Sequence, residues 1–424
     1  MKNKVTLNSF IGNERLKILP DNLDLTLPKL PDGWRYLQLK DLLIRKPQYG
    51  LTAKSISERK GVRYIRISDI TDFGKLKFTD QKFVDIDKET FDNYRLEEDD
   101  VLIARSGSVG RIYLHEGTHE PSVFASYLIR FKLDKQKIVP KFLFYYCLSP
   151  FYKNFIQETL RVVAQPNINA KELCRLKVPV PSLDVQRRVV ARLEEITAKI
   201  EHAKKLREEA LKETEKIMQT TLHQIFSNPE QKGWKLSTLE EVAPIQSNSI
   251  QSLDPDKLYN YISLEHIESN TGRLINFAPT PGAEIKSSKI AFTREHVLYG
   301  KLRPYLNKVF VPDFDGICTT ELVPLLPRKE TITREFLAWQ LRSPQFVNYA
   351  MSNLTGTRMP RISLEALKNA KVAIPPIDEQ IRIAALLDKL QNQIAEIRQC
   401  QKETVEKLEK MTQTILKKAF MGEL

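Results

Sequence analysis

The segment VPVPSLDVQRRVVARLEEITAKI, residues 178–200, returns 194 positions further along the chain as VAIPPIDEQIRIAALLDKLQNQI, residues 372–394. In each copy a short apolar run ends in proline. An acidic residue follows, Asp184 or Asp378, where a carboxylate favours the N-terminus of a helix. Apolar residues then recur at intervals of four and three, which is typical of a helix with one buried stripe. Each copy is therefore predicted to begin a long helix.

The first of these helices is predicted to run from Leu183 to Phe226, roughly 65 Å at ~1.5 Å per residue. Two such helices can cover each other's stripes, and repeats related by a two-fold axis would run them antiparallel as a coiled coil. Two core helices of a compact domain are the weaker alternative, because helices this long seldom pack inside one small core. The predicted seam consists of Val189, Leu193, Ile196, Ile200, Ala203, Ala210 and Ile217 in the first helix and of Ile383, Leu387, Leu390, Ile394, Ile397, Leu408, Met411 and Ile415 in the second.

Outward from the helices, the whole chain reads as two copies of one unit. The offset between matching residues drifts from 200 to 194 through the front of each copy and then stays at 194, so the back of the unit has kept its length. Ordered matches of this kind identify an internal repeat. The matched pairs include Trp34 with Trp234, Tyr64 with Tyr261, Val101 with Val297, Phe142 with Phe336, Pro181 with Pro375, Gln186 with Gln380, and Phe226 with Phe420.

The front of each copy has the pattern of a mixed α/β domain. Short β-rich runs occur at Val62–Ile70, Val101–Ala104 and Ala125–Leu133, and an aromatic, helix-like stretch follows at 140–160 with a break at Ser149-Pro150. The predicted fold class is α+β, with two mixed α/β domains in a pseudo-two-fold repeat, separated by two long antiparallel coiled-coil helices. The predicted domains are an N-terminal extension at 1–30, α/β domains at 31–180 and 229–374, and helices at 181–228 and 375–424.

The composition is that of a soluble globular protein with a basic surface. The net charge is +13 and the pI about 9.3, a balance that favours a polyanionic partner, although charge alone fits a solvated basic surface equally well. The four cysteines lie far apart in sequence, which favours reduced thiols over a zinc site. The chain lacks an apolar run of 18 residues, and the N-terminus lacks a leader-like apolar stretch. A cytoplasmic protein without a membrane segment is therefore expected.

Sequence motifs for catalysis are missing. The chain has no phosphate-binding loop, no G-x-G-x-x-G, no H-E-x-x-H, no paired C-x-x-C and no adenine-methyltransferase string. The carboxylate pairs Asp99–Asp100 and Glu240–Glu241 lie beside predicted strand or helix starts, where they would cap or solvate an element. We therefore expect no catalytic residue, no metal site and no enzyme activity of its own.

Two turns at the same position of the repeat carry residues suited to DNA. A Gly-rich turn lets the backbone approach closely, serine donates to phosphate or base edges, and arginine can pair with guanine through two hydrogen bonds. An exposed basic hairpin turn is the alternative. The candidates are Arg105, Ser106, Ser108 and Arg111 in ARSGSVGR, residues 104–111, and Lys301, Arg303, Tyr305, Asn307 and Lys308 in YGKLRPYLNKV, residues 299–309.

A second pair of polar loops precedes the last short element of each front half. The first is QPNIN, residues 165–169, with Gln165 and Asn167, and the second is RMPRI, residues 358–362, with Arg358 and Arg361. An ordinary loop held by a proline explains these segments as well as a DNA contact does.

Taken together, these strings resemble the specificity subunit of type I restriction–modification systems, over Pro31 to Leu424. The first copy departs from the Pro-Pro-x-x-Glu-Gln pattern, since Ser182 and Val185 replace the second Pro and the Glu, and residues before Pro31 have no counterpart. The resemblance rests on PDGW at Pro31, VLIARSGSVGR at Val101, QPNINAKEL at Gln165, VPVPSLDVQ at Val178, LYGKLRPYLNK at Leu298 and AIPPIDEQIRIAALLD at Ala373.

The resemblance implies a division of labour. Each front half would be a target-recognition domain that reads one half of a split site in double-stranded DNA, and the helices would set the spacing. Two methyltransferase subunits would dock and bring S-adenosylmethionine. Two restriction subunits, with ATP and Mg²⁺, could join them, while this chain would hold no cofactor. A stand-alone DNA-binding regulator and a coiled-coil scaffold without a DNA role are the alternatives.

Overall fold

The fold is described by a computed structural model, which covers residues 28–117, 120–161, 167–286, 288–356 and 358–424. The chain folds as two units. The first contains the described residues from Pro28 to Lys204 and the C-terminal segment Val405–Leu424, and the second contains the described residues of Lys205–Thr404. Both long helices therefore contribute one segment to each unit. None of the described helices is long and apolar enough to span a lipid bilayer.

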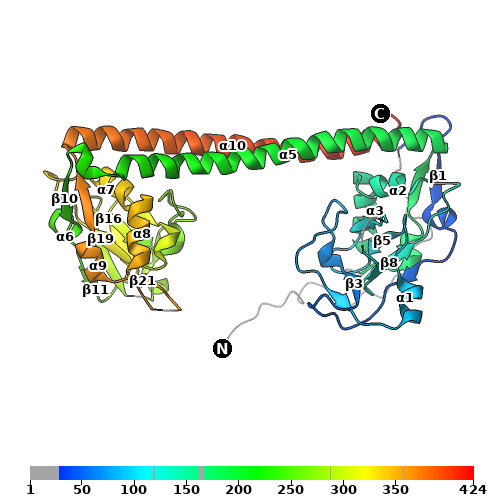
Figure 1. Ribbon diagram of the computed structural model, residues 1–424, viewed down its shortest axis with the longest axis horizontal. Helices are drawn as coiled ribbons and strands as arrows, with labels where there is room; N and C mark the ends of the chain where they lie inside the picture. The colour runs from blue at the N-terminus through cyan, green and yellow to red at the C-terminus, as the bar shows by residue number, and fades with distance from the viewer. Residues whose placement is uncertain (1–27, 118–119, 162–166, 287, 357) are drawn as a thin grey trace. The chain divides into compact units, whose positions relative to one another are not determined.

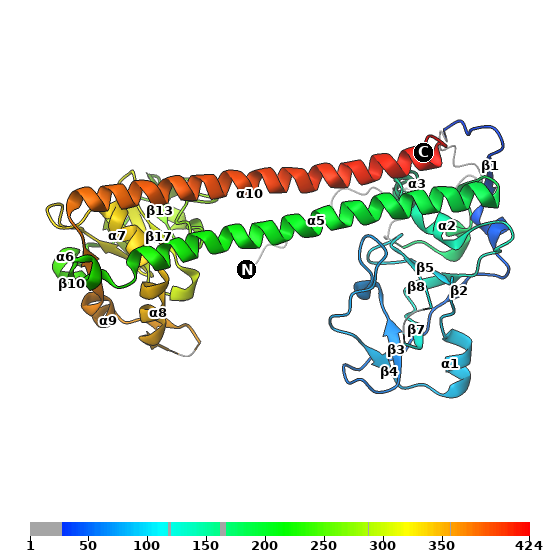
Figure 2. The same cartoon turned by 45° about the horizontal axis from the view of Figure 1, so that its top comes forward.

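The first unit is built around two small sheets (Figures 1 and 2). One has the strand order β2-β8-β5-β6, the other β4-β3-β7, and β1 pairs with β9 beside them. The strands are β1 (Arg35–Gln38), β2 (Gln48–Tyr49), β3 (Val62–Ile65), β4 (Phe83–Val84), β5 (Val101–Ala104), β6 (Ile112–Leu114), β7 (Ser122–Phe124), β8 (Leu128–Phe131) and β9 (Lys177–Val180), and the shorter helices are α1 (Lys88–Tyr94), α2 (Pro140–Tyr146), α3 (Pro150–Arg161) and α4 (Ala170–Leu173).

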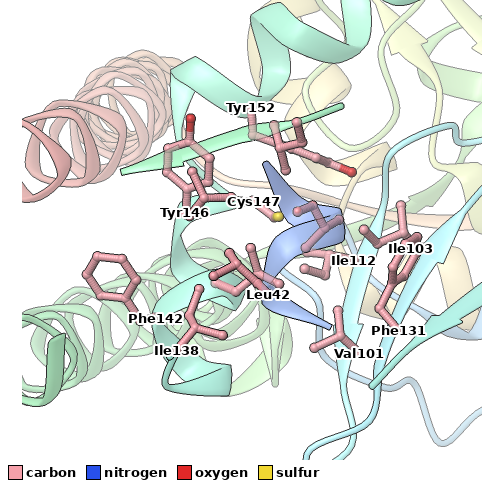
Figure 3. Packing of buried hydrophobic residues seen from close by; sticks show 14 of the residues in the cluster. Leu42, Val101, Ile103, Ile112, Phe131, Ile138, Phe142, Tyr146, Cys147 and Tyr152 are labelled. Carbon is pink, nitrogen blue, oxygen red and sulfur yellow. The ribbon is translucent and has the colours of Figure 1, made fainter. Parts of the chain in front are cut away.

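The core of this unit lies between the sheet and the helices. Figure 3 shows Val101, Ile103 and Phe131 of the sheet at one side of this core and Phe142 of α2 at the other, with Leu42 and Ile112 between them. The core strand β5 is buried at every position, which explains its unbroken apolar sequence. The break between α2 and α3 falls at Ser149-Pro150 as predicted, because Pro150 can start a helix but cannot continue one.

The second unit repeats this plan with its own sheets. Their strand orders are β17-β16-β19 and β11-β15-β18-β13, with the pairs β10-β22, β12-β14 and β20-β21 beside them. The strands are β10 (Lys235–Thr238), β11 (Ser249–Ile250), β12 (Leu258–Tyr259), β13 (Tyr261–Ile262), β14 (Thr280–Pro281), β15 (Lys289–Phe292), β16 (Val297–Gly300), β17 (Val309–Phe310), β18 (Gly316–Thr319), β19 (Leu322–Leu325), β20 (Leu354–Thr355), β21 (Arg361–Ile362) and β22 (Lys371–Ile374), and the shorter helices are α6 (Leu239–Val242), α7 (Arg334–Leu341), α8 (Pro344–Ser352) and α9 (Leu364–Asn369).

The sequence repeat is thus a repeat of structure. Strand β3 pairs with β7 in parallel, and β13 pairs with β18 in parallel at the matching place. Antiparallel β5–β6 and β5–β8 pairs correspond to β16–β17 and β16–β19. The predicted fold class, mixed α/β units with two long helices, is confirmed. The predicted strand at Ala125–Leu133 is shorter, since β7 and β8 flank a turn at residues 125–127.

The two long helices are α5 (Leu183–Phe226) and α10 (Ile377–Phe420), each of 44 residues. Within each unit a segment of α5 lies beside an antiparallel segment of α10 (Figures 1 and 2). In the first unit Leu193 shares a core with Leu416 and Phe420, and in the second Leu222 shares one with Leu387. The first helix has the bounds that its periodicity predicts.

The seam is buried at some of its predicted positions. Leu193, Ile200, Leu387 and Ile394 are buried, while Ile196 and Leu390 are partly buried. The prediction is wrong at Ala210, which is exposed, and at Ile217, Ile397 and Met411, which are 50%, 42% and 52% exposed. A 3.6-residue helical turn rotates a strict seven-residue repeat by roughly 20° per heptad, and near their ends both helices also pack against the α/β layers. One seam cannot then cover every apolar position.

A buried glutamine attaches the start of each long helix to the unit in which that helix begins. Oε1 of Gln186 accepts a hydrogen bond from the Val139 amide at 2.8 Å, and its Nε2 donates to the carbonyl oxygens of Lys137 and Pro181. Gln380 makes the equivalent bonds with Thr333, Thr331 and Pro375. Both glutamines are fully buried, so these bonds satisfy polar groups that solvent cannot reach.

Candidate nucleic-acid interface

Three segments meet at the end of β5 in the first unit. The amide of Arg105 donates to the carbonyl of Tyr127 at 2.9 Å, and the amide of Ile168 donates to the carbonyl of Arg105 at 2.8 Å. Ser106 and Asn167 form an isolated antiparallel bridge. The turn after β5, the turn before β8 and the loop before α4 are therefore joined through their backbones. We call this arrangement the junction.

The side chains of the first junction combine an arginine, an amide and tyrosines. Nε of Arg105 donates to Oδ1 of Asn167 at 3.3 Å, and its guanidinium lies over the ring of Tyr49 with 4.9 Å between Cζ and the ring centroid. Tyr127 is 61% exposed. Gly107, beside the junction, has φ +69° and open space where a Cβ would stand, so a ligand can approach its backbone closely.

The second unit builds the same junction from the equivalent segments. The amide of Lys301 donates to the carbonyl of Glu321 at 3.0 Å, and the amide of Ile362 donates to the carbonyl of Lys301 at 3.1 Å. Leu302 and Arg361 form the isolated bridge. The backbone pattern is therefore shared by the two units, whereas the side chains differ.

In the second junction an arginine is held by a carboxylate. Nε of Arg361 donates to both Glu321 oxygens, at 3.2 and 3.0 Å, and Nη2 donates to Oε1 at 2.8 Å. These hydrogen bonds from Arg361, together with the nearby charge of Lys301, hold the pKa of Glu321 below its ordinary value. The pair is partly exposed, with 24% of the Glu321 and 35% of the Arg361 side chain accessible.

The candidates in the first turn divide into two groups. Ser106 is partly buried and Ser108 is exposed beside the junction. Arg111 instead points into its own unit. Its Nη1 donates to the carbonyl of Ile70 at 2.9 Å, and its Nη2 pairs with Asp72. These partners give Arg111 a structural role, in which it fastens the loop after β3.

The second turn also contains both accessible and buried candidates. Arg303 is exposed, and Tyr305 is 50% exposed. Arg303 has φ +50° and begins a short 3-10 helix at Pro304–Leu306. Asn307 is buried and donates from Nδ2 to the carbonyl of Arg342 at 2.9 Å. The Nζ of Lys308 donates to the carbonyl of Leu264 at 2.6 Å, and burial lowers its pKa, so Asn307 and Lys308 hold the turn in place.

The polar loop before the last short element contributes Asn167 and Arg361 to the junctions. Arg358 is exposed, and Gln165 lies outside the described residues. Sequence reasoning missed Tyr49, Tyr127 and Glu321. Tyr127 and Glu321 stand 194 positions apart, so the repeat offset could have paired them. For Tyr49 the repeat offset gives no such signal.

The paired carboxylates have structural partners. Asp100 is buried, accepts from the Glu97 amide at 2.9 Å and lies 3.3 Å from Nη1 of Arg130. Glu241 closes a capping box with Thr238 at the start of α6. Across the part of the chain that the structure describes, no group of three or more His, Cys, Asp or Glu side chains is arranged to hold a metal ion.

Each of the two α/β units contains a junction, and the two junctions have the same backbone hydrogen bonds but different polar side chains. This arrangement is that of a protein with two related recognition domains in one chain. The chain belongs to the family of type I restriction modification DNA specificity domains, whose model matches residues 31–212 and again 231–407. Proteins of this family supply the DNA sequence specificity of a type I restriction–modification system and are not its catalytic subunits.

Individual relatives match over different lengths. The EcoDI specificity subunit of Escherichia coli is 30% identical over 193 residues, 45% of this chain and 42% of that protein. The MjaVIII specificity subunit of Methanocaldococcus jannaschii is 26% identical over 361 residues, 79% of this chain and 81% of that protein. A chain from a structural study of assembly and conformational transition in a type I system has a TM-score of 0.73 at 24% identity, covering 94% of this chain and 100% of that one, which supports the fold.

Proposed function

We propose that each unit reads one half of a bipartite site in double-stranded DNA through the surface around its junction. One observation carries this proposal. The two junctions share their backbone hydrogen bonds but display Arg105, Tyr127 and Asn167 in one unit and Lys301, Glu321 and Arg361 in the other. A constant scaffold with changed polar side chains is what two readers of different base sequences need.

The exposed candidates near the junctions complete the proposed interface. Ser106 and Ser108 would contact the first half-site, and Lys301, Arg303, Tyr305 and Arg358 the second. The proposal leaves out Arg111, Asn307 and Lys308, because their side chains are bonded inside the protein. The net charge of +13 supports association with DNA through its phosphates.

The proposed function includes partner subunits that carry the chemistry. Two methyltransferase subunits would bind this chain and bring S-adenosylmethionine to adenines near each half-site. Restriction subunits, with ATP and Mg²⁺, would complete a system that also cuts. The expected location is the cytoplasm, where the DNA of a prokaryotic cell lies.

The test is co-expression with the companion methyltransferase, followed by purification and mapping of methylated adenines on a genome that lacks the system. A complex with two methyltransferase copies that modifies one bipartite sequence is the expected result. A chain that binds specific DNA tightly without that subunit would indicate a stand-alone regulator. A complex whose DNA binding is insensitive to salt and sequence would indicate a scaffold.

A further inference from the structure

Each junction contains one arginine whose Nε is already occupied by an acceptor from a neighbouring segment. In the first unit the arginine is Arg105, on the turn after β5, and the acceptor is Asn167. In the second unit the arginine is Arg361, on the loop before α9, and the acceptor is Glu321. The arginines come from different segments, so the repeat alone does not account for their shared arrangement.

The remaining N–H groups of these arginines form a defined set. A guanidinium has five N–H donors in a planar fork. For Arg361, Glu321 takes Nε–H and one hydrogen of Nη2, and the Met359 carbonyl takes one hydrogen of Nη1 at 3.1 Å. One N–H on each Nη atom is left. Among the described residues, none accepts a hydrogen bond from Nη1 or Nη2 of Arg105.

N–H donors on Nη1 and Nη2 of one guanidinium can pair with two acceptors that lie in its plane. In the major groove of DNA, guanine offers such a pair in N7 and O6. A phosphate offers the same acceptor chemistry, but its oxygens accept from many directions, so an arginine that binds phosphate gains less from a fixed orientation. Glu321 also argues against a phosphate site, since its carboxylate cancels the charge that would attract one.

The anchoring acceptor gives the arginine its orientation. A free arginine side chain loses rotamer freedom when it binds, and an anchored one has lost part of it on folding. Stacking on Tyr49 further restricts Arg105. Asn167 and Glu321 are therefore positioning residues, and they act through the arginine that each one holds.

We infer that each half-site contains a guanine, read by Arg105 in one half and by Arg361 in the other through N7 and O6. This inference rests on the proposed function and adds to it one base in each half-site and the atoms that recognise it. Asn167 and Glu321 set the geometry of the contact without touching the base.

The first test changes the DNA and leaves the protein intact. Once the half-sites are mapped, each of their guanines is replaced in turn by 7-deazaguanine, which has a C–H in place of N7. Binding by the complex with its methyltransferase is then measured. One position in each half-site should weaken binding roughly ten- to one hundred-fold. Unchanged binding at every guanine of a half-site overturns the inference for that half, although the bipartite site itself would stand.

The second test assigns the arginine. R361Q should lose the preference for guanine at one position of one half-site and should no longer respond to 7-deazaguanine there, while the other half-site keeps its preferences. R105Q should do the same in the other half. R382Q is the matched control, because Arg382 is 78% exposed on α10 and outside both junctions, and it should leave every base preference unchanged.

The conservative variants distinguish reading from positioning. E321Q keeps an acceptor but loses the carboxylate, so the guanine preference should fall less than in R361Q. R361K keeps the charge but not the fork, and it should lose base preference while keeping overall affinity. If R361Q instead weakens binding to all sequences equally and reduces its salt dependence, while R361K keeps both, Arg361 binds phosphate and the guanine reading is wrong. A complex without any sequence preference would contradict the proposed function itself.

Discussion

Nη1 of Arg207 donates a hydrogen bond to Oε1 of Gln401 at 2.6 Å, and these residues stand 194 positions apart, at equivalent places in the repeat. When two helices are related by a two-fold axis, a residue meets its own counterpart only at that axis. Within the second unit, which contains both residues, the antiparallel helix pair therefore places Arg207 opposite its own counterpart. The peptide bond that follows Arg207 consequently lies opposite the peptide bond that follows Cys400.

This geometry locates a test of the idea that the helices set the spacing between half-sites. Seven residues inserted after Arg207 and seven after Cys400 would lengthen both helices at facing points and keep the seam in phase. The insertion adds about 10 Å of helix, so the gap between unchanged half-sites should grow by about three base pairs at ~3.4 Å each. Methylated sites are then mapped as for the parent complex.

The single insertions are the controls for this experiment. Lengthening α5 or α10 alone leaves the two helices out of register, so neither variant should give an active complex. An active double-insertion complex that modifies sites with the original gap would show that helix length does not determine the spacing.

The buried glutamines should each contribute strongly to the stability of their own unit. In Q186A or Q380A, the Val139 or Thr333 amide and two carbonyl oxygens lose their partner inside the core. At about 1–3 kcal/mol for each unsatisfied buried group, and because only the proline carbonyl bond is fully buried while the other two are part-buried, a loss of roughly 3 kcal/mol in unfolding free energy is expected, measured by denaturant unfolding of the complex. Q399A, an exposed position on α10, is the control and should change stability little.

Hydrogen exchange would assign each loss to its unit. Q186A should increase exchange in the first unit around Val139, and Q380A in the second unit around Thr333. If either substitution increased hydrogen exchange equally in both units, the conclusion that each glutamine stabilises only one unit would be wrong.

Lys301 and Arg303 are expected to serve the second half-site alone. K301A combined with R303A should weaken recognition of that half by about 1–3 kcal/mol for each base that these side chains read. The first half-site should be unchanged, as measured with libraries randomised in one half at a time. Equal weakening of both halves would mean that these residues bind phosphate or support the fold.

The backbone conformation of Arg303 allows the effect of its side chain on DNA recognition to be separated from its effect on stability. Its φ of +50° suits glycine, so R303G should be at least as stable as R303A in thermal unfolding, while both remove the same side chain from the DNA. A glycine variant that keeps full recognition would exclude the Arg303 side chain from the interface.

The Glu321–Arg361 pair should add stability that disappears in acid. Arg361 lowers the folded-state pKa of Glu321, so the contribution is present above the unfolded-state pKa of about 4.3 and is lost as the pH falls through the lower folded value. Denaturant unfolding should find the wild type more stable than E321Q at pH 7, with the difference shrinking as the pH falls below about 4.3 and disappearing once Glu321 is protonated in the folded protein. A difference that stays constant as the pH falls from 7 through the range where carboxyl groups are protonated would show that the charge of Glu321 is not its source.

The sequence by itself determined the long helices and the repeat. An apolar residue every three or four positions depends only on the geometry of one helix, so a long helix from Leu183 to near Phe226 could be predicted, as observed. The internal repeat likewise requires no knowledge of contacts, and it located both candidate turns, which match at an offset of 196. The buried strand Val101–Ala104 was visible for the same reason, since every one of its residues is apolar.

The tertiary structure alone decided which polar side chains share a site and which face inward. Strand pairing brings Arg105 and Asn167 together across 62 positions. The spacing of neighbouring residues in the sequence does not indicate such a contact. Arg105 and Arg111 look alike in the sequence, yet the loop after β3 occupies the guanidinium of Arg111 and leaves the Nη atoms of Arg105 available. The partner of a polar side chain depends on segments folded against it from elsewhere in the chain, whereas the periodicity of a helix is local.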